Sequence, residues 1–458
     1  MPSISLGPIA SGLPKDLVKQ LVEAEREPIR KLENRKQDEE AKLKLVQDLS
    51  SRINDISSGL KDLTKFRNFR DLMAVNPRAD LMDVTVDKNS AEPGSYQIEV
   101  VRLAGQSSIM SNGFPDADDT QVGAGYFSYE LPNGETKEVY IDPDNSTLQG
   151  VARMINKEKD LQLNAIVVDD GTGSENPFRL IVTHTKTGEV NDAEFPNFYF
   201  LDGDEDFYME KERPAQNSLV KVNGFEVEFE GNKIDTLLPG VTLDLKDAAP
   251  GKEFTLKVQE DNKSVRGKVE GMVGKLNEVL SFIQGQNKLD KDSNTRTTLG
   301  GDITLQTLEY KVRQLVQTPV ATEFGGVRMG DLGVTFTRNG LLEFSGDKFE
   351  KALNKNFAAV SQFFVGLEDE GDGFASKLDG TVKSMTRQEG VVQSRVDGIK
   401  RRIRDIDQQI EVKERQIART EQALKDKFSA LEGTIAKLKG QQASVAGALG
   451  GGGALPGL

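Results

Sequence analysis

Apolar residues recur at heptad spacing near the start of the chain, between Leu13 and Phe66. The main seam consists of Val46, Leu49, Ile53, Ile56, Leu60 and Leu63, and a shorter stripe upstream consists of Leu13, Leu17, Leu21 and Ala24. Alternating steps of three and four place these side chains along one side of a helix, as in a coiled coil. Pro28 lies between the two stripes. Because proline cannot donate the helical hydrogen bond, we expect a break or kink there.

The last segment of the chain, from Val391 to Leu449, carries a second heptad pattern and no proline. Its seam consists of Ile399, Ile403, Ile406, Ile410, Ile417 and Leu424, and after a one-residue slip at Phe428 it continues with Leu431, Ile435, Leu438, Val445 and Leu449. A helix of this length would span roughly 90 Å. Two terminal heptad helices suggest a stem in which they pair with each other. Two separate coiled coils and one long helical bundle remain as alternatives.

Between the two ends the apolar period changes to two, from about Leu81 to Val258. Alternating residues predict antiparallel strands, and the pairs Asn133-Gly134 and Asn223-Gly224 predict two hairpins. One helix is expected at 148–155, capped by Ser146 or Thr147. The segments 116–119 and 191–214 read as loops that separate two β modules.

From Asn262 to Phe364 the pattern is helical again, and a hairpin at Asn339-Gly340 interrupts it. The sequence thus predicts an α+β fold with a coiled-coil stem, a helical-bundle domain with a β-hairpin, and an inserted antiparallel β head of two modules. The expected boundaries are an N-terminal stem helix at 1–45, a helix of the helical domain at 46–75, the first part of β module one at 76–115, an inserted outer β module at 116–214, the second part of module one at 215–261, the helical domain at 262–400, a C-terminal stem helix at 401–449 and a flexible tail at 450–458.

Composition directs attention to binding or structural roles. The 458 residues suggest about three domains. The formal net charge is −14, and the stretch Asp80–Asp261 alone holds 36 acidic and 15 basic residues, which argues against nucleic acid as a partner. The chain has no cysteine and one histidine, so thiolate sites and His-based catalysis are nearly excluded. We see no apolar run of the roughly 18 residues that a membrane span needs, and no cleavable secretory signal.

The search for chemistry finds no catalytic, metal or cofactor-binding residues. Calcium loops starting at Asp202 or Asp290 fail, because position six is Phe207 or Thr295 where a glycine is needed. His184 lies in a predicted strand and is expected to be a structural histidine. An aromatic group, Tyr199, Phe200, Phe207 and Tyr208, is expected to anchor the core, with a partner-binding or glycan-stacking patch as the alternative.

The order of several motifs resembles the flagellar hook-associated protein 2 family, the filament cap proteins of bacterial flagella. The matching segments are Ser11-Gly12-Leu13 with Pro28-Ile29, the run from Pro93 to Val100, Asp144 to Leu148, Asn223-Gly224 followed by Gly240 to Leu243, and Asp331 to Val334 followed by Asn339-Gly340. Each motif alone is moderate, and their common order is specific. Pro14 departs from the family pattern, which commonly has Asp after Gly-Leu.

The resemblance implies a non-enzymatic protein without cofactors, exported through the flagellar channel to the filament tip without a cleavable signal peptide. It would form a homo-oligomeric cap that promotes flagellin folding and insertion. Its partners would be copies of itself, flagellin, the export apparatus and a cytoplasmic export chaperone, with host surface glycans as a further candidate. A surface adhesin with a coiled-coil stalk and a hook–filament junction protein are the alternatives.

We expect the heptad seams to carry the contacts between subunits and with the filament. The candidate interface residues are Leu13, Leu17, Leu21, Leu49, Ile53, Ile56, Leu60, Ile399, Ile403, Ile406, Ile410, Leu431, Ile435 and Leu438.

Overall fold

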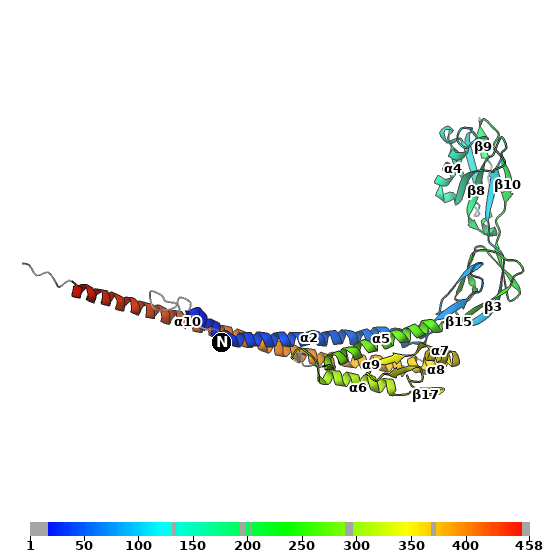
Figure 1. The fold of residues 1–458 in the computed structure, drawn as a ribbon. Helices are drawn as coiled ribbons and strands as arrows, with labels where there is room; N and C mark the ends of the chain where they lie inside the picture. The colour runs from blue at the N-terminus through cyan, green and yellow to red at the C-terminus, as the bar shows by residue number, and fades with distance from the viewer. Residues whose placement is uncertain are drawn as a thin grey trace, which may run out of the picture. The chain divides into compact units, whose positions relative to one another are not determined.

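The computed structural model describes residues 17–130, 134, 136–192, 198–201, 203–288, 296–367 and 372–450. The chain divides into two compact units (Figure 1). Unit 1 comprises residues 1–69 and 266–458, and unit 2 comprises residues 70–265. The helix–β–helix order predicted from the sequence is confirmed, because the β-rich unit 2 is inserted between the two helical parts of unit 1.

Unit 1 is built from helices and two small hairpins. Its helices are α1 (Leu17–Glu25), α2 (Glu27–Leu60), α3 (Phe66–Phe69), α5 (Asn262–Asn287, in unit 1 from Arg266), α6 (Ile303–Gln317), α7 (Gly346–Lys355), α8 (Phe357–Val365), α9 (Phe374–Thr386) and α10 (Val391–Gly450). The hairpins pair β16 (Val320–Thr322) with β17 (Gly325–Val327) and β18 (Val334–Phe336) with β19 (Leu342–Phe344).

The core of unit 1 lies where α2 packs against α9 and α10. The α2 seam residues Leu49, Ile53, Ile56 and Leu60 are fully buried there. Phenylalanine rings fill the adjoining space: Phe363 stacks on Phe374 with ring centroids 5.4 Å apart, and Phe69 stacks on Phe364 at 5.6 Å. Aromatic pairs at these distances add stabilisation beyond the area they bury.

Two details concern the helices of unit 1. The residues between Phe349 and Phe363 form two helices, because Asn356 interrupts them and its side chain accepts a hydrogen bond from the Ala359 amide at 3.0 Å. On α6, the apolar side chain of Ile303 is 72% exposed. The buried face of α6 consists of Leu305, Leu308, Val312 and Val316.

The inner β module of unit 2 contains two antiparallel sheets around one core. The five-stranded sheet has the order β1-β15-β3-β11-β12 and the three-stranded sheet the order β13-β14-β2. The strands are β1 (Leu72–Val75), β2 (Met82–Val86), β3 (Gly94–Arg102), β11 (Ser218–Val222), β12 (Phe225–Phe229), β13 (Lys233–Leu238), β14 (Val241–Leu245) and β15 (Phe254–Glu260). The predicted Asn223-Gly224 turn is confirmed: both residues have positive φ, 50° and 86°, as a two-residue hairpin turn needs.

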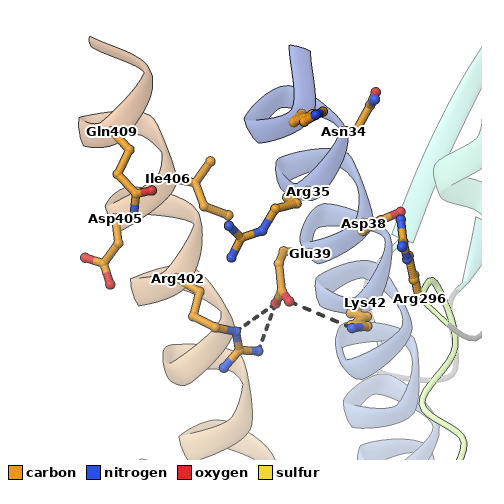
Figure 2. Close-up of a pocket in the computed structure, with 11 residues that line it drawn as sticks. Asn34, Arg35, Asp38, Glu39, Lys42, Arg296, Arg402, Asp405, Ile406 and Gln409 are labelled. Carbon is orange, nitrogen blue, oxygen red and sulfur yellow. Dashed lines mark hydrogen bonds and ion pairs between the residues drawn. The ribbon is translucent and has the colours of Figure 1, made fainter. Parts of the chain in front are cut away.

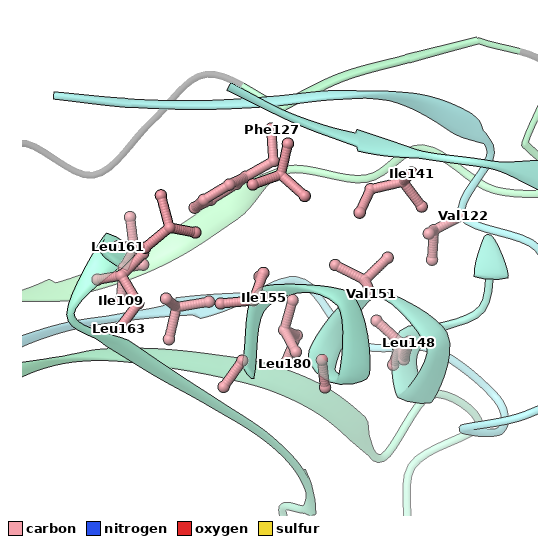
Figure 3. Packing of buried hydrophobic residues seen from close by; sticks show 14 of the residues in the cluster. Ile109, Val122, Phe127, Ile141, Leu148, Val151, Ile155, Leu161, Leu163 and Leu180 are labelled. Atoms are coloured by element: carbon pink, nitrogen blue, oxygen red, sulfur yellow. The ribbon is translucent and has the colours of Figure 1, made fainter. Parts of the chain in front are cut away.

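The outer β module combines a four-stranded sheet, β10-β4-β8-β7, with a three-stranded sheet, β6-β5-β9, and one helix. Its elements are β4 (Gln106–Ser111), β5 (Ala124–Glu130), β6 (Thr136–Ile141), α4 (Leu148–Lys157), β7 (Leu163–Asp169), β8 (Phe178–Thr187), β9 (Phe198–Leu201) and β10 (Met209–Arg213). The core lies between α4 and the strands, where Val151 and Ile155 point toward Phe127 and Ile141 (Figure 3). Thr147 caps α4, as one of the two predicted caps, by accepting a hydrogen bond from the Gly150 amide at 3.2 Å.

Pairing in the outer module corrects two expectations. Residues 191–214 were read as a loop, but they contain β9 and β10. β9 pairs with β5 and β10 pairs with β4, so partners more than 60 residues away define these strands. β4 itself, placed by the sequence in module one, pairs with β8 of the outer module. Asn133 of the other predicted hairpin lies outside the described residues, while β5 and β6 pair as expected.

His184 is a buried structural residue of β8, only 1% exposed. The Lys186 amide donates to its Nδ1 at 3.3 Å, and its Nε2 is buried with no hydrogen-bond partner. Burial lowers the pKa of His184 below the ordinary value of 6.5. The fold therefore favours the neutral form of the ring.

This burial predicts a pH dependence of stability. The unfolded chain binds a proton at His184 below about pH 6.5, and the fold resists it, so the free energy of unfolding falls as the pH drops through that value, by at most about 1.4 kcal/mol per pH unit. Hydrogen bonds from Thr172 and Arg179 bring the pKa of Asp170 to about 2, well below this pH. Because the chain has one histidine, thermal unfolding of the wild type at pH 7.5 and 5.5, compared with His184→Leu, isolates the effect. Equal loss of Tm in both proteins would contradict it.

Candidate functional site

The candidate site is the helical stem, which we define as α1 and the first part of α2 (residues 17–45) with residues 401–450 of α10. The N-terminal helix of the stem is interrupted near Pro28, as the sequence predicted. Helix α1 ends at Glu25 and α2 begins at Glu27, with Pro28 in the first turn of α2. A proline is tolerated there because the first amides of a helix have no partner within it. The Ile29 amide donates to the Arg26 carbonyl at 2.9 Å, so the two helices follow closely on each other.

The stem helices pair with each other within one chain, as the two heptad patterns predicted (Figure 1). Their apolar contact is narrow. Val22, Ile29 and Ile417 are buried, with Val18, Ile410 and Leu424 packed partly against them. A seam this thin buries little apolar area, so it contributes much less than the core of unit 1.

Charged pairs join α2 to α10 where apolar residues are scarce. Arg402 donates from Nε and Nη2 to Glu39 Oε2 at 2.9 and 2.8 Å, and Glu39 also lies 3.8 Å from Lys42 Nζ (Figure 2). One turn further along α10, Lys36 Nζ lies 2.7 Å from Asp407 Oδ1. The hydrogen bond to Asp407 raises the pKa of the Lys36 ammonium above its ordinary value. Ile406 is buried close to these charges, beside a polar hollow of about 730 Å³.

These pairs act on alignment more than on stability. Each pair is partly exposed to water, and such pairs contribute about 0–1 kcal/mol. A shift of one turn between the helices would place Glu39 near other charges of α10 and lose both pairs together. Complementary charges beside a heptad seam are a known device for fixing which residues face each other.

The structure separates the predicted interface residues into three groups. Those packed inside unit 1 and buried are Leu49, Ile53, Ile56, Leu60, Ile399 and Ile406. Those half-buried along α10 are Ile403, Ile410 and Ile435. Those with exposed side chains are Leu21, Leu431 and Leu438, at 41%, 45% and 58%. Leu13 lies outside the described residues, and Leu17 begins α1.

Sequence reasoning missed the charged residues that join the stem, because it placed the contacts in the apolar heptad seams alone. The signal was present as opposite charges at positions 36 and 39 on one helix and 407 and 402 on the other. Which charges meet depends on the alignment of two helices more than 360 residues apart, and a heptad pattern alone does not give that alignment.

Other candidate chemistry finds no support in the described part of the chain. No group of acidic or histidine residues there could hold a metal ion, and no helix there is long and apolar enough to cross a membrane. Asp202 and the residues from Asp290 to Asn294 lie outside the described ranges. The aromatic group divides: Phe200 and Phe207 pack against the outer core, while Tyr199 and Tyr208 are exposed.

The charged pairing generates a testable prediction. Reversing either charge, by Arg402→Glu or Glu39→Arg, should lower the free energy of unfolding, because like charges then face each other across the stem. The double reversal should recover most of the loss, giving a coupling of about 0.5–1 kcal/mol. Urea unfolding of the full chain, followed by circular dichroism, measures all four forms.

Arg401→Glu is the matched control for this cycle, since Arg401 is an exposed neighbour on the same helix. It should change stability little. If the effects of the two single reversals simply add in the double variant, Glu39 and Arg402 do not interact in solution.

Comparison with known proteins identifies the family. The family model described as flagellar hook-associated protein 2 N-terminus matches residues 11–107, and the one described as flagellar hook-associated protein 2 C-terminus matches residues 215–440. The B-type flagellar hook-associated protein 2 of Pseudomonas aeruginosa PAO1 is 27% identical over 387 residues, 78% of each chain. The flagellar hook-associated protein 2 of Escherichia coli K12 is 23% identical over 427 residues, 89% of each chain.

A solved structure supports the fold, and a second is similar in sequence. The crystal structure of the D1-D2-D3 domains of the flagellar cap protein FliD from Escherichia coli covers 78% of this chain and 100% of its own, with a TM-score of 0.54 and 22% identity. The flagellar cap protein FliD from Bdellovibrio bacteriovorus is 48% identical over 41% of this chain and 99% of its own, with a TM-score of 0.36. From the two matched regions, which together include the stem, the helical domain and the inner β module, we conclude that the chain belongs to the flagellar hook-associated protein 2 family.

Proposed function

We propose that this protein caps the distal end of the bacterial flagellar filament as a homo-oligomer. The observation that carries the proposal is the pair of family matches over both halves of unit 1 and the inner β module. The architecture supports it, because the chain order is that of a β-rich unit inserted between two helical segments whose terminal helices pair with each other. In this role the protein is required for filament elongation and motility.

The exposed part of the seam is the proposed contact with neighbouring subunits and with the filament. Leu431 and Leu438 lie seven residues apart on α10 and are exposed, with half-buried Ile435 between them. Apolar side chains at this spacing form one stripe on a helix, and a partner helix would remove it from water. The buried residues, from Leu49 to Leu60 and at Ile399, support the contact indirectly by holding α10 in place.

The remaining parts of the role follow from that position. The protein would be extracellular at the flagellum tip, which it would reach through the export apparatus with a cytoplasmic chaperone. Flagellin would be its partner, and the stem helices would promote flagellin folding and polymerisation. The role is mechanical and non-enzymatic, and it needs no cofactor.

The two alternative functions have weaker support. A hook–filament junction protein would belong to another family of axial proteins, and the matches here are to the cap family over both halves of unit 1. An adhesin would need a binding surface on the head.

The seam proposal predicts that Leu438→Glu weakens assembly. A charged side chain at a position that a neighbour buries loses about 1.5–3 kcal/mol of apolar burial, so association should weaken about tenfold or more. Sedimentation of the purified full chain, with electron microscopy of the same fractions, should show closed rings with legs for the wild type and smaller species for the variant.

Val412→Glu is the matched control, since Val412 is on the same helix, is 45% exposed and lies off the heptad seam. It should assemble like the wild type. The same three forms, expressed in a motile bacterium that lacks its own cap protein, test function through filament length and swimming. A wild-type chain that restores no filaments would overturn the capping proposal, and normal filaments with Leu438→Glu would overturn only the seam.

A further inference from the structure

A side chain of helix α4 covers the free edge of strand β7 in the outer β module. β7 is the last strand of the four-stranded sheet, and within the described residues it pairs with β8 alone. Near the end of α4, Asn156 contacts the opposite edge of β7. Its Nδ2 donates to the Ala165 carbonyl at 2.7 Å, and its Oδ1 accepts from the Ala165 amide at 2.8 Å. One asparagine thus makes both hydrogen bonds that a further strand would make to Ala165.

The pairing register shows which backbone groups of β7 face this edge. Antiparallel partners alternate between hydrogen-bonded and non-hydrogen-bonded pairs. Just before β7, the Thr185 amide donates to the Gln162 carbonyl at 2.8 Å, so the even-numbered residues bond to β8 and the odd-numbered residues face outward. Val167 therefore faces outward like Ala165. Its amide and carbonyl have no hydrogen-bond partner in the part of the chain that the structure describes.

The sequence of β7 gives little protection against pairing with another strand. Residues Leu163–Val168 read Leu-Asn-Ala-Ile-Val-Val, with three β-branched side chains and no charge, proline or glycine. Short segments with these features are the ones that pair with copies of themselves. β7 also runs beside β8 without any shift of register, and the side chain of Ile166 is 48% exposed.

The opposite edge of the same sheet is protected in the ordinary way. Strand β10 has the sequence Met-Glu-Lys-Glu-Arg, in which four of five residues are charged, and its register with β4 shifts between Met209 and Lys211. Charges and register shifts are common means by which edge strands avoid pairing with other chains. β7 has neither before Asp169, and Asn156 occupies its outward edge instead.

We propose that the outward edge of β7 is a strand-pairing surface that Asn156 blocks, and that the strand it fits is β7 of a second copy. Two antiparallel copies related by a two-fold axis at Val167 would place each Ala165 opposite Asp169 of the other strand, so like charges would not meet directly. The Val167 backbone groups would then gain partners. Asn156 is itself exposed, so a second strand could reach the edge once its side chain is removed. The proposal does not rest on the capping function, since it concerns the outer module alone.

Removal of this side chain in the full chain tests the proposal. Asn156→Ala frees the Ala165 backbone groups, so the variant should associate about tenfold or more tightly than the wild type. Sedimentation velocity over a concentration series measures the association, at an ionic strength that screens repulsion between the acidic stretches of two copies. Amide hydrogen exchange at residues 163–169 of the variant should slow as its concentration rises, because pairing protects the outward amides.

Asn164→Ala is the matched control, because Asn164 is an exposed asparagine on β7 itself and its loss leaves the edge blocked. It should sediment like the wild type. A rescue variant combines Asn156→Ala with Ile166→Lys. Because lysine on an edge strand opposes pairing, this double variant should also sediment like the wild type. Asn156→Ser, whose side chain is too short to bond both groups, is the second variant if Asn156→Ala does not fold.

Two results would overturn the proposal. One is that Asn156→Ala folds but sediments like the wild type at every concentration, which would leave Asn156 as a structural link between α4 and β7 only. The other is that the association of Asn156→Ala persists in the double variant with Ile166→Lys, which would place the contact elsewhere on the molecule. Neither result depends on whether the wild type forms rings, because each variant is compared with the wild-type species.

Discussion

The fold depends on the pairing of its first long helix with its last. α2 and α10 are separated by 330 residues of sequence, and their contact closes unit 1. The pairing has two physical regimes. From Leu49 to Leu60 the α2 side chains are buried in a helical core, and this burial supplies the stability. Toward the start of α2 the contact passes to the pairs Glu39–Arg402 and Lys36–Asp407, which fix alignment. The buried core thus stabilises one end of the α2–α10 pair, and the ion pairs align the two helices beyond it.

Everything between these helices is an insertion, and the outer β module is an insertion within it. The chain leaves the inner module after β3 and returns at β11, and the two connections meet where the Gly105 amide donates to the Gln216 carbonyl at 2.9 Å. An insertion whose ends lie together can change without disturbing its host. The family matches stop at residue 107 and resume at 215, close to the same two places.

Local signals in the sequence predicted the local parts of the structure. The Asn223-Gly224 turn, the Thr147 cap and the break at Pro28 each follow from one residue type in one backbone conformation. Long-range pairing was harder to predict. β9 and β10 lie in a stretch rich in acidic and aromatic residues with little alternation, and they are strands because β5 and β4 supply their hydrogen bonds. Likewise, the heptad pattern predicted which residues lie on the seam. It did not predict whether the same chain or another molecule buries each of them. Leu49 and Leu438 occupy equivalent positions by pattern, and only the first is buried by its own chain.

The uneven burial of the seam bears on when the stem becomes ordered. Beyond Leu424 the described part of α10 has only exposed or half-buried side chains, whereas its first turns pack into the core of unit 1. A helix is costly to begin and cheap to extend, so the core near Ile399 acts as the nucleus from which α10 grows outward. The far end gains little from tertiary packing and depends on propensity, which Gly433 and Gly440 weaken by about 1 kcal/mol each relative to alanine. Burial of Leu431 and Leu438 by a neighbouring subunit would offset that weakness. Under the proposed seam contact, ordering of the far end of α10 and assembly of the cap would be coupled, because the contact that joins subunits would also complete the helix.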